Sequence, residues 1–267
     1  MTNILRTTHN WGFFSCCSVR LDDIVKYFNK NERLPDIVDS SEHFGWYKGE
    51  QNNIDITFRY FAHYDNNTIK IDYHADIDYM ENYQYNDYST LKYEDISPFI
   101  RKYFSPSDEI RLLIEELEVK YNLNYENICV LFYRGNDKIT ETKLCSYDEY
   151  IKYAQEVLVK NPDVRFFIQS DETEFIETMT ALFPSNSFYM SDEIRHMRKC
   201  INTVDLIGKF RNDIVKYSKL YLAITIIMSK CKYIICGSGN CSIWIMFYRG
   251  NHKNMYQNNN GQWIISK

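Results

Sequence analysis

Hydrophobic positions in the second half of the chain fall into two kinds of pattern, which alternate along the sequence. Short continuous apolar runs, typical of buried strands, occupy residues 128–132, 164–168, 187–190 and 232–236. Apolar residues at helical spacing occupy residues 146–158, 171–182, 212–229 and 240–248. This order predicts an α/β fold with a parallel sheet covered by helices on both faces. The carboxyl ends of its strands then meet at one rim, where ligands of such folds bind.

A change of pattern divides the chain near residue 105. Two Ser-Pro pairs, Ser97-Pro98 and Ser105-Pro106, interrupt the sequence there. After the second pair, apolar residues at helical spacing predict a helix over residues 105–120, with a serine cap and a proline in the first turn. We therefore expect two domains, a small one over residues 1–104 and a larger one over residues 105–267.

The amino-terminal part carries weaker signals. Residues 54–60 and 68–73 alternate between apolar and polar side chains, which predicts strands. Residues 18–28 have apolar side chains at helical spacing, which predicts a helix. Residues 79–93 are polar and rich in tyrosine, so we expect a loop or an extended surface segment there.

Composition narrows the possible partners. The chain has 267 residues and a formal net charge of −5, without a cluster of Lys and Arg, so a nucleic acid is not expected as a partner. None of the eight cysteines forms a C-x-x-C pair, which indicates reduced core thiols in a cytoplasmic protein rather than a zinc site. No apolar stretch is long enough for a transmembrane helix. The 23 tyrosines reflect either an AT-rich genome or rings that line a sugar site.

Three loops are expected at the rim of the sheet, at residues 132–138, 169–172 and 236–242. In the first loop, Arg134 offers a planar, permanently charged fork that matches phosphate oxygens. The third loop, Gly-Ser-Gly-Asn, exposes backbone N–H groups at the start of a helix, where the dipole favours negative charge. Together the loops predict a site for an anionic ligand such as a diphosphate.

The same three segments resemble the motifs of a known family. Residues 130–138 are similar to the HYRGTDK loop of the superfamily that contains α1,6-fucosyltransferases, nodulation fucosyltransferases and protein O-fucosyltransferases. Residues 166–172 resemble its second motif, a strand that ends in Ser-Asp, and residues 228–244 resemble its third. The resemblance covers about 120 residues. It implies a GT-B fold with two facing Rossmann-like domains, the amino-terminal one small and degenerate here, and a metal-independent, inverting sugar transfer.

The resemblance also implies a set of functional residues. Arg134 would hold the β-phosphate of a nucleoside-diphosphate sugar and stabilise the departing diphosphate. The residues expected to bind this donor or to shape the loops around it are Tyr133, Gly135, Asp137, Lys138, Ser170, Asp171, Gly237, Ser238, Gly239, Asn240 and Ser242. No cofactor or metal is expected, and the donor is expected to be GDP-linked, with fucose or another hexose as its sugar. The acceptor would be a hydroxyl of a glycan, a lipid-linked sugar or a protein.

Two positions depart from the family pattern. Phe132 stands where the family often has a histidine, and Ile224 aligns with a common aspartate. In the family both positions lie near the guanine base. The loss of such a hydrogen-bonding pair weakens base discrimination by ~1–3 kcal/mol.

The first domain has its own candidate loop, residues 9–15, which precedes the helix expected at residues 18–28 and is expected to face a cleft between the domains. His9 in this loop has a suitable ordinary pKa to act as the base for an acceptor hydroxyl.

Three other interpretations remain open from the sequence. Asp76-Ile77-Asp78, with Asp72 and His74 nearby, matches the D-x-D pattern of metal-dependent glycosyltransferases. Phe132 and Ile224 are also compatible with a protein that binds a nucleotide sugar without catalysis. A purely structural protein with this fold would bind no nucleotide.

Overall fold

The computed structural model describes residues 2–49, 54–66, 70–71, 76–206 and 213–267. Its main sheet has six strands in the order β5-β4-β3-β6-β7-β8. In chain order the strands are β3 (Ile128–Tyr133), β4 (Arg165–Ser170), β5 (Ser187–Phe188), β6 (Tyr233–Gly237), β7 (Met255–Asn259) and β8 (Gln262–Ser266). All neighbouring pairs are parallel except β7 and β8, so the predicted parallel sheet is confirmed.

Helices pack against this sheet and complete the alternation expected from the sequence. They are α3 (Asp108–Lys120), α4 (Tyr147–Lys160), α5 (Thr173–Leu182), α7 (Ile214–Lys230) and α8 (Asn240–Arg249). Helix α4 begins at a capping box in which Ser146 and Glu149 satisfy each other's backbone N–H groups. All six residues of β3 are buried, because this strand lies in the middle of the sheet with a neighbour on each side.

The β7–β8 hairpin at the carboxyl terminus is not among the predicted elements. Its turn contains Asn260 at φ 50° and Gly261 at φ 85°, both in the left-handed region. Asn-Gly at the centre of a two-residue turn is a strong hairpin signal, since both residues tolerate positive φ. The Asn-Gly pair is therefore a sequence signal for this hairpin, although the polar residues of its strands do not show a clear strand pattern.

The amino-terminal half is irregular. Its helices are α1 (Phe13–Asn31) and α2 (Tyr93–Tyr103), and its two-stranded parallel sheet pairs β1 (Ile4–Arg6) with β2 (Ile37–Asp39). The remaining elements are the 3-10 turns η1 (Gly45–Tyr47), η2 (Thr57–Arg59), η3 (Tyr64–Asn66), η4 (Glu81–Tyr85) and η5 (Tyr88–Thr90). The helix predicted at residues 18–28 is confirmed within α1.

The strand expected at residues 54–60 is wrong. Residues 54–60 form a bend and η2 instead of a strand, because the Asp55 carboxylate accepts the N–H groups of Thr57 and Ser40, each at 2.9 Å, and closes a turn. Residues 79–93, expected as a loop or an extended surface segment, contain two 3-10 turns, and Tyr79, Tyr88 and Tyr93 are buried. Ser97-Pro98, at the change of pattern, lies inside α2. The strand expected at residues 68–73 falls mostly outside the described residues.

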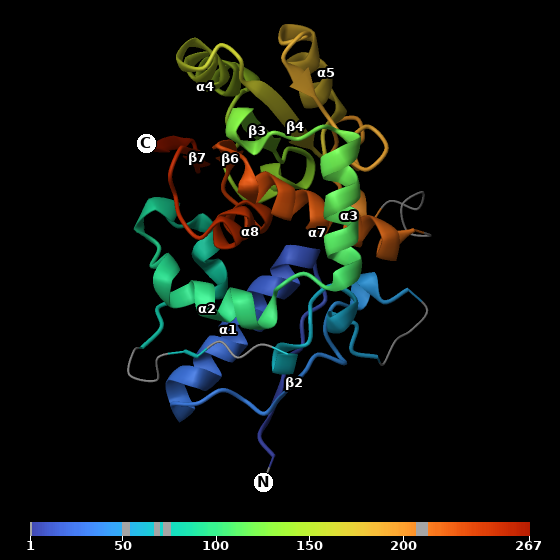
Figure 1. Cartoon of the computed structure of the whole chain (residues 1–267), viewed down its shortest axis with the longest axis vertical. Coiled ribbons are helices and arrows are strands. Elements are labelled where there is room, and N and C mark those ends of the chain that lie inside the picture. Colours follow the sequence, from blue (N-terminus) through green and yellow to red (C-terminus); the bar gives the residue numbers. More distant parts are fainter. Residues whose placement is uncertain (1, 50–53, 67–69, 72–75, 207–212) are drawn as a thin grey trace.

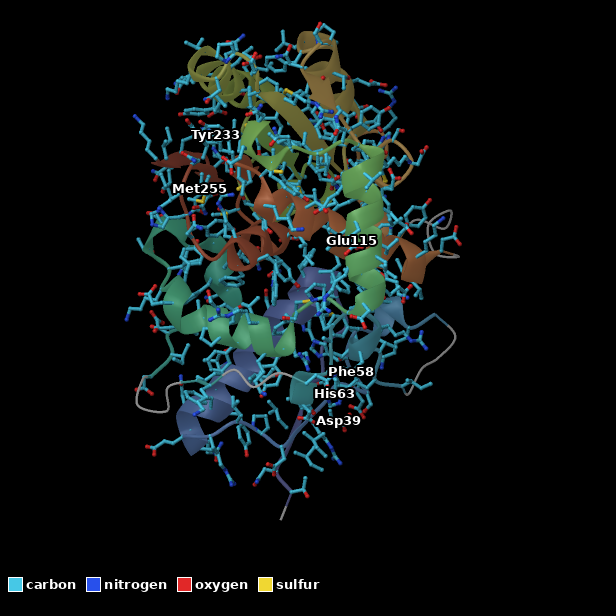
Figure 2. The ribbon with its side chains drawn as sticks, in the orientation of Figure 1. Asp39, Phe58, His63, Glu115, Tyr233 and Met255 are labelled. Carbon is cyan, nitrogen blue, oxygen red and sulfur yellow. The ribbon has the colours of Figure 1, made fainter. Side chains whose placement is uncertain are left out.

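The two halves share one continuous apolar core. Figure 1 shows α7 and α8 between the sheet and the amino-terminal elements α1 and α2. The fully buried Trp244 of α8 donates its indole N–H to Ser18 of α1 at 2.9 Å, and its ring lies 4.7 Å from that of Phe104. In Figure 2, Phe58 and His63 lie at the far end from Tyr233 and Met255 of the sheet. The domain boundary at residue 105 remains a prediction.

Two further features bear on the sequence-based expectations. All eight cysteines are free thiols, and seven of them are buried. No helix among the described residues is both long and apolar enough to cross a lipid bilayer.

Candidate functional site

A cavity of about 250 Å³, partly open to solvent, lies where the carboxyl ends of β3 and β6 meet the start of α1. This volume is close to the lower end of small-molecule sites, about 300 Å³. The sheet half contributes Arg134, Asp137, Lys138, Glu141, Ser238, Gly239, Asn240, Cys241 and Ser242 to its walls, among others. The amino-terminal half contributes Trp11, Gly12, Phe13, Phe14, Ser15, Trp46 and Gln84. The loop expected to face a cleft, residues 9–15, therefore borders the same cavity as the first and third rim loops.

Arg134 is held in place by three partners. Its Nε donates to Asp171 at 2.9 Å, its Nη2 donates to Asp137 at 3.0 Å, and its Nη1 donates to the hydroxyl of Tyr221 at 3.3 Å. Burial opposes the charge of the guanidinium, but Asp171, Tyr221 and Asp137 together raise the pKa of Arg134 well above its ordinary value. The side chain keeps 22% of its surface exposed on the cavity side. A permanent cation is thus fixed in orientation before any ligand arrives.

The predicted residues at the end of β4 support the Arg134 loop and do not line the cavity. Asp171 is 3% exposed, and besides Arg134 it accepts the backbone N–H of Gly135 at 3.0 Å. The buried Ser170 accepts the N–H of Glu172 at 3.0 Å. Asp171 also borders a small adjoining cavity, which Ile224 lines as well. These side chains therefore hold the cation in position from behind.

Gly135 is required by close packing. A Cβ at this position would lie 2.0 Å from Oε2 of Glu172 and 2.8 Å from the ring of Tyr133. Tyr133 is itself buried, and its ring stacks on Phe175 at 4.7 Å, so it cannot move aside without opening the core. Burial raises the pKa of Glu172. Tyr133 and Gly135, both predicted site residues, thus shape the loop from below the cavity.

Two backbone N–H groups of the turn before α8 form hydrogen bonds within the protein. Ser238 N–H donates to Asn258 at 2.9 Å, and Gly239 N–H donates to the hydroxyl of Tyr88 at 3.1 Å. Gly239 adopts φ +154°, which favours glycine. Gly237 lines a smaller neighbouring cavity that also contacts Tyr133 and Lys138. These backbone donors, expected to face an anion, instead fix the turn against its neighbours.

The amino end of α8 itself lines the cavity. The first intrahelical bond runs from Ile243 N–H to Gly239 at 3.0 Å, so the N–H groups of residues 240–242 precede the hydrogen-bonded ladder. The first turn of α8 contains no acidic side chain. Asn240 accepts the hydroxyl of Ser18 at 2.8 Å, and Ser242 donates to Gly237. The helix dipole and these N–H groups therefore favour a bound anion here.

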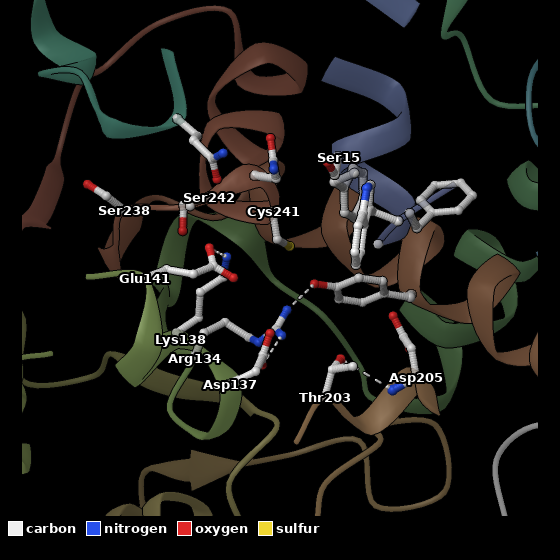
Figure 3. A pocket seen from close by; sticks show the side chains of 18 of the residues that line it. Ser15, Arg134, Asp137, Lys138, Glu141, Thr203, Asp205, Ser238, Cys241 and Ser242 are labelled. Carbon is white, nitrogen blue, oxygen red and sulfur yellow. Dashed lines mark hydrogen bonds and ion pairs between the residues drawn. The ribbon is translucent and has the colours of Figure 1, made fainter. Parts of the chain in front are cut away.

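The first and third rim loops meet across the cavity. Lys138 Cε lies 3.8 Å from the position that a Cβ of Gly239 would take, and Lys138 Nζ pairs with Glu141. Figure 3 shows Arg134 and Lys138 on one side of the cavity and Cys241 and Ser242 on the other. The guanidinium of Arg134, the ammonium of Lys138 and the amino end of α8 thus border the same cavity.

His9 lies behind Ser15. Its Nε2 is 2.9 Å from the Ser15 hydroxyl, and Ser15 lines the cavity whereas His9 is not among its lining residues. Burial lowers the pKa of His9, and Glu81 opposes this effect in part. The imidazole is therefore neutral at pH 7, and with the proton on Nδ1 its Nε2 accepts the serine O–H.

Sequence reasoning did not identify two side chains that organise the site. Tyr221 of α7 provides the third partner of Arg134, and Asp205 joins the segments on either side of the cavity by pairing with Arg195 at 2.8 Å and accepting the Tyr47 hydroxyl at 2.9 Å. Tyr221 falls within a helix whose residues look like ordinary core, and Asp205 lies in a segment without periodic pattern. Only the three-dimensional arrangement identifies them.

The D-x-D segment lies elsewhere. Asp76 and Asp78 are exposed, neither lines the cavity, and Asp78 accepts the hydroxyl of Tyr83. Asp72 and His74 are outside the described residues. Within the described part of the chain, no group of three His, Cys, Asp or Glu side chains is arranged to hold a metal ion.

Comparison with known proteins identifies the fold. No protein-family model and no curated protein sequence matches the chain. Among solved structures, NodZ α1,6-fucosyltransferase soaked with GDP-fucose is similar over 100% of both chains, with a TM-score of 0.59 and 12% identity. The same enzyme co-crystallised with GDP gives 0.57 and 12% over 100% of this chain and 99% of the other, and fucosyltransferase NodZ from Bradyrhizobium gives 0.55 and 10% over 100% of both. The chain therefore has the GT-B-like α/β fold of the fucosyltransferase NodZ, as the three motifs predicted.

Proposed function

We propose that this protein is a glycosyltransferase that moves a sugar from a nucleoside-diphosphate donor to an acceptor hydroxyl, with inversion and without a metal. The observation that carries the proposal is the shared cavity of Arg134, Lys138 and the amino end of α8. This arrangement suits a diphosphate, and it occurs in a chain that has the fold of a fucosyltransferase. The sugar would be fucose or another hexose, and a GDP-linked donor is favoured because NodZ was crystallised with GDP.

In the proposed reaction, the acceptor oxygen attacks the anomeric carbon while the bond from that carbon to the diphosphate breaks. Negative charge develops on the diphosphate, and Arg134 and the helix end at Asn240 stabilise it. Both groups are fixed in advance by protein contacts, and such preorganised donors contribute most when charge develops in a partly dehydrated site. Departure of the diphosphate would thus be promoted by the sheet half of the chain.

The acceptor must also lose a proton. We assign this step to His9, acting through Ser15, because the serine hydroxyl lies between His9 Nε2 and the cavity. The acceptor O–H would donate to Ser15 Oγ while the serine proton moves to His9, so that one proton is transferred in total. Because His9 is neutral at pH 7, it is ready to accept that proton.

A second function, nucleotide-sugar binding without catalysis, is favoured by one observation. All three nitrogens of Arg134 already have protein partners, so a phosphate would have to share them with Asp171, Asp137 and Tyr221. The replacement of the family histidine and aspartate by Phe132 and Ile224 also favours binding without catalysis.

A thermal-shift panel with GDP, UDP, dTDP, ADP and CMP tests the proposal and identifies the base. A nucleotide present at about 100 times its Kd stabilises the fold by ~2.7 kcal/mol. We expect a clear shift with at least one nucleoside diphosphate and a loss of that shift in Arg134→Ala. The matching nucleotide sugars are then tested for sugar release and transfer. A shift without either would support the binding module, and no shift with any nucleotide would refute both functions.

A further inference from the structure

Two tryptophans stand at the rim of the cavity on its amino-terminal side. Trp11 is 62% exposed, and its ring lies 5.6 Å from that of the partly buried Trp46 in an edge-to-face arrangement of 67°. Both line the cavity. By contrast, Trp244 is completely buried, and Trp263 packs 4.4 Å from Tyr153 and donates to Glu149. A large indole left in water next to a binding cavity is unusual and needs a reason.

The wall around these tryptophans differs in charge from the opposite wall. Its described lining residues are all uncharged, whereas the sheet half contributes Arg134 and Lys138 together with the carboxylates of Asp137, Glu141 and Asp205. A Cβ on Gly12 would meet nothing within 4 Å, so space is open beside Trp11. The wall thus offers flat apolar surface and room, and no charged side chain of its own.

The two walls are connected by direct packing. The ring of Phe14 lies 5.2 Å from that of Tyr221, and the Tyr221 hydroxyl accepts from Arg134. Ser15 follows Phe14 at the start of α1 and also lines the cavity. A molecule seated on Trp11 and Trp46 would therefore lie beside the group to which the acceptor proton was assigned and across from the cations.

We propose that Trp11 and Trp46 form the acceptor subsite and that it takes a neutral sugar ring, so the acceptor is a glycan. This inference rests on the proposed function and chooses among its possible acceptors. A pyranose has one apolar C–H face that suits an indole ring and a rim of hydroxyls that suits Ser15. A charged peptide or a long acyl chain would find neither complementary charge nor a closed apolar groove on this wall.

The experiment compares Trp11→Ala and Trp46→Ala with Phe58→Ala, an exposed aromatic of the same half that does not line the cavity. Quenching of indole fluorescence by iodide is measured with cellobiose, N,N′-diacetylchitobiose and lactose, and with an uncharged Ser/Thr peptide, first without nucleotide. We expect at least one disaccharide to protect the indoles of the wild-type protein and of Phe58→Ala. In Trp11→Ala the apparent Kd for that sugar should rise about tenfold, the size of a lost aromatic contact.

With the donor found by the thermal-shift panel, Trp11→Ala should raise the KM for the same disaccharide about tenfold and change kcat much less. The thermal shift produced by the nucleoside diphosphate should persist in this variant. Sugar binding that is unaffected by both Trp substitutions, or transfer to the peptide and to none of the sugars, would overturn the inference. A wild-type dimer that is seen in sedimentation and that Trp11→Ala dissociates would also overturn the inference. Sugar binding without any nucleotide response would uphold the inference and refute the proposed function instead.

Discussion

The two walls of the cavity come from halves of the chain that are built in different ways. The sheet half brings its residues together through regular geometry, since the loops after β3 and β6 follow adjacent parallel strands in register. The amino-terminal half has little regular structure, and its aromatic rings and 3-10 turns are held by contacts with distant residues. An example is Tyr88, whose hydroxyl donates to Gly239 O at 3.2 Å and whose N–H donates to Gln257 at 2.9 Å.

The halves also treat charge differently. In the sheet half the buried carboxylate of Asp171 is balanced by Arg134, so that a full ion pair persists next to the cavity. In the amino-terminal half the buried His43 is kept neutral, because burial lowers its pKa to about 4. The sheet half thus places an ion pair beside the cavity, whereas His43 does not line it. Four predictions test this contrast, beginning with the largest expected effect.

Arg134→Lys should reduce sugar transfer by ~10²–10³-fold, because the ammonium cannot reproduce the bidentate fork of the guanidinium. Steady-state rates with the donor identified above measure the effect. Arg198→Lys serves as the matched control, since Arg198 is exposed and pairs with Glu177 away from the cavity. Wild-type activity in Arg134→Lys would exclude Arg134 as the group that stabilises the leaving diphosphate.

Asp171→Asn should destabilise the fold by about 3 kcal/mol, the lower end of the cost of breaking a buried ion pair, because Arg134 keeps Asp137 and some solvent contact. Urea unfolding with a common m-value measures it. Asp108→Asn removes the exposed pair with Arg111 and should change stability little. Equal effects of the two substitutions would mean that Asp171 does not anchor the loop.

The outline of the site follows from the sequence because parallel strands deliver their following loops to one edge. Residues 128–132, 164–168 and 232–236 are recognisable as strands, and this alone places Arg134 near the start of α8. Sequence could not separate residues that line the cavity from those behind it. Asp137 and Asp171 both pair with Arg134, yet only Asp137 lines the main cavity, a distinction set by loop conformation.

The amino-terminal wall was far less predictable. Its alternating segment at residues 54–60 resembles a strand, but a local Asp55 turn prevails, and no strand among the described residues pairs with it. Trp46 and Gln84 reach the cavity from 3-10 turns whose positions depend on long-range packing. Such long-range contacts leave no local pattern in the sequence. The candidate loop at residues 9–15 was therefore the only part of this wall that the sequence predicted.

Acidification should destabilise the protein through His43. Its Nε2–H donates to Cys16 O at 2.8 Å. Burial, Arg20 and His9 outweigh this hydrogen bond and the charge of Asp55, and lower the pKa of His43 to about 4, against 6.5 for an ordinary histidine. Between these values only the unfolded chain binds the proton. The free energy of unfolding therefore falls as pH falls from 6.5 to 4, by up to about 3 kcal/mol for this group.

Urea unfolding at several pH values measures this slope in the wild type, in His43→Gln and in His63→Gln, whose side chain is exposed. His43→Gln should lose most of the dependence between pH 4 and 6.5, whereas His63→Gln should keep it. An unchanged slope in His43→Gln would show that other titrating groups, and not this buried imidazole, govern stability in that range.

The smallest effect is expected from removal of metal ions. If the sheet half alone handles the diphosphate, EDTA should leave transfer unchanged, and Asp78→Asn should alter the rate less than about twofold, as for other surface substitutions. Asp78 is exposed and borders no part of the cavity, so its only described partner is the hydroxyl of Tyr83. Loss of activity in EDTA that Mn²⁺ restores, together with a large effect of Asp78→Asn, would move phosphate binding to the amino-terminal half. The contrast between a charged and an uncharged wall would then be reversed, because the acidic segment at residues 76–78 would have to approach the donor during the reaction.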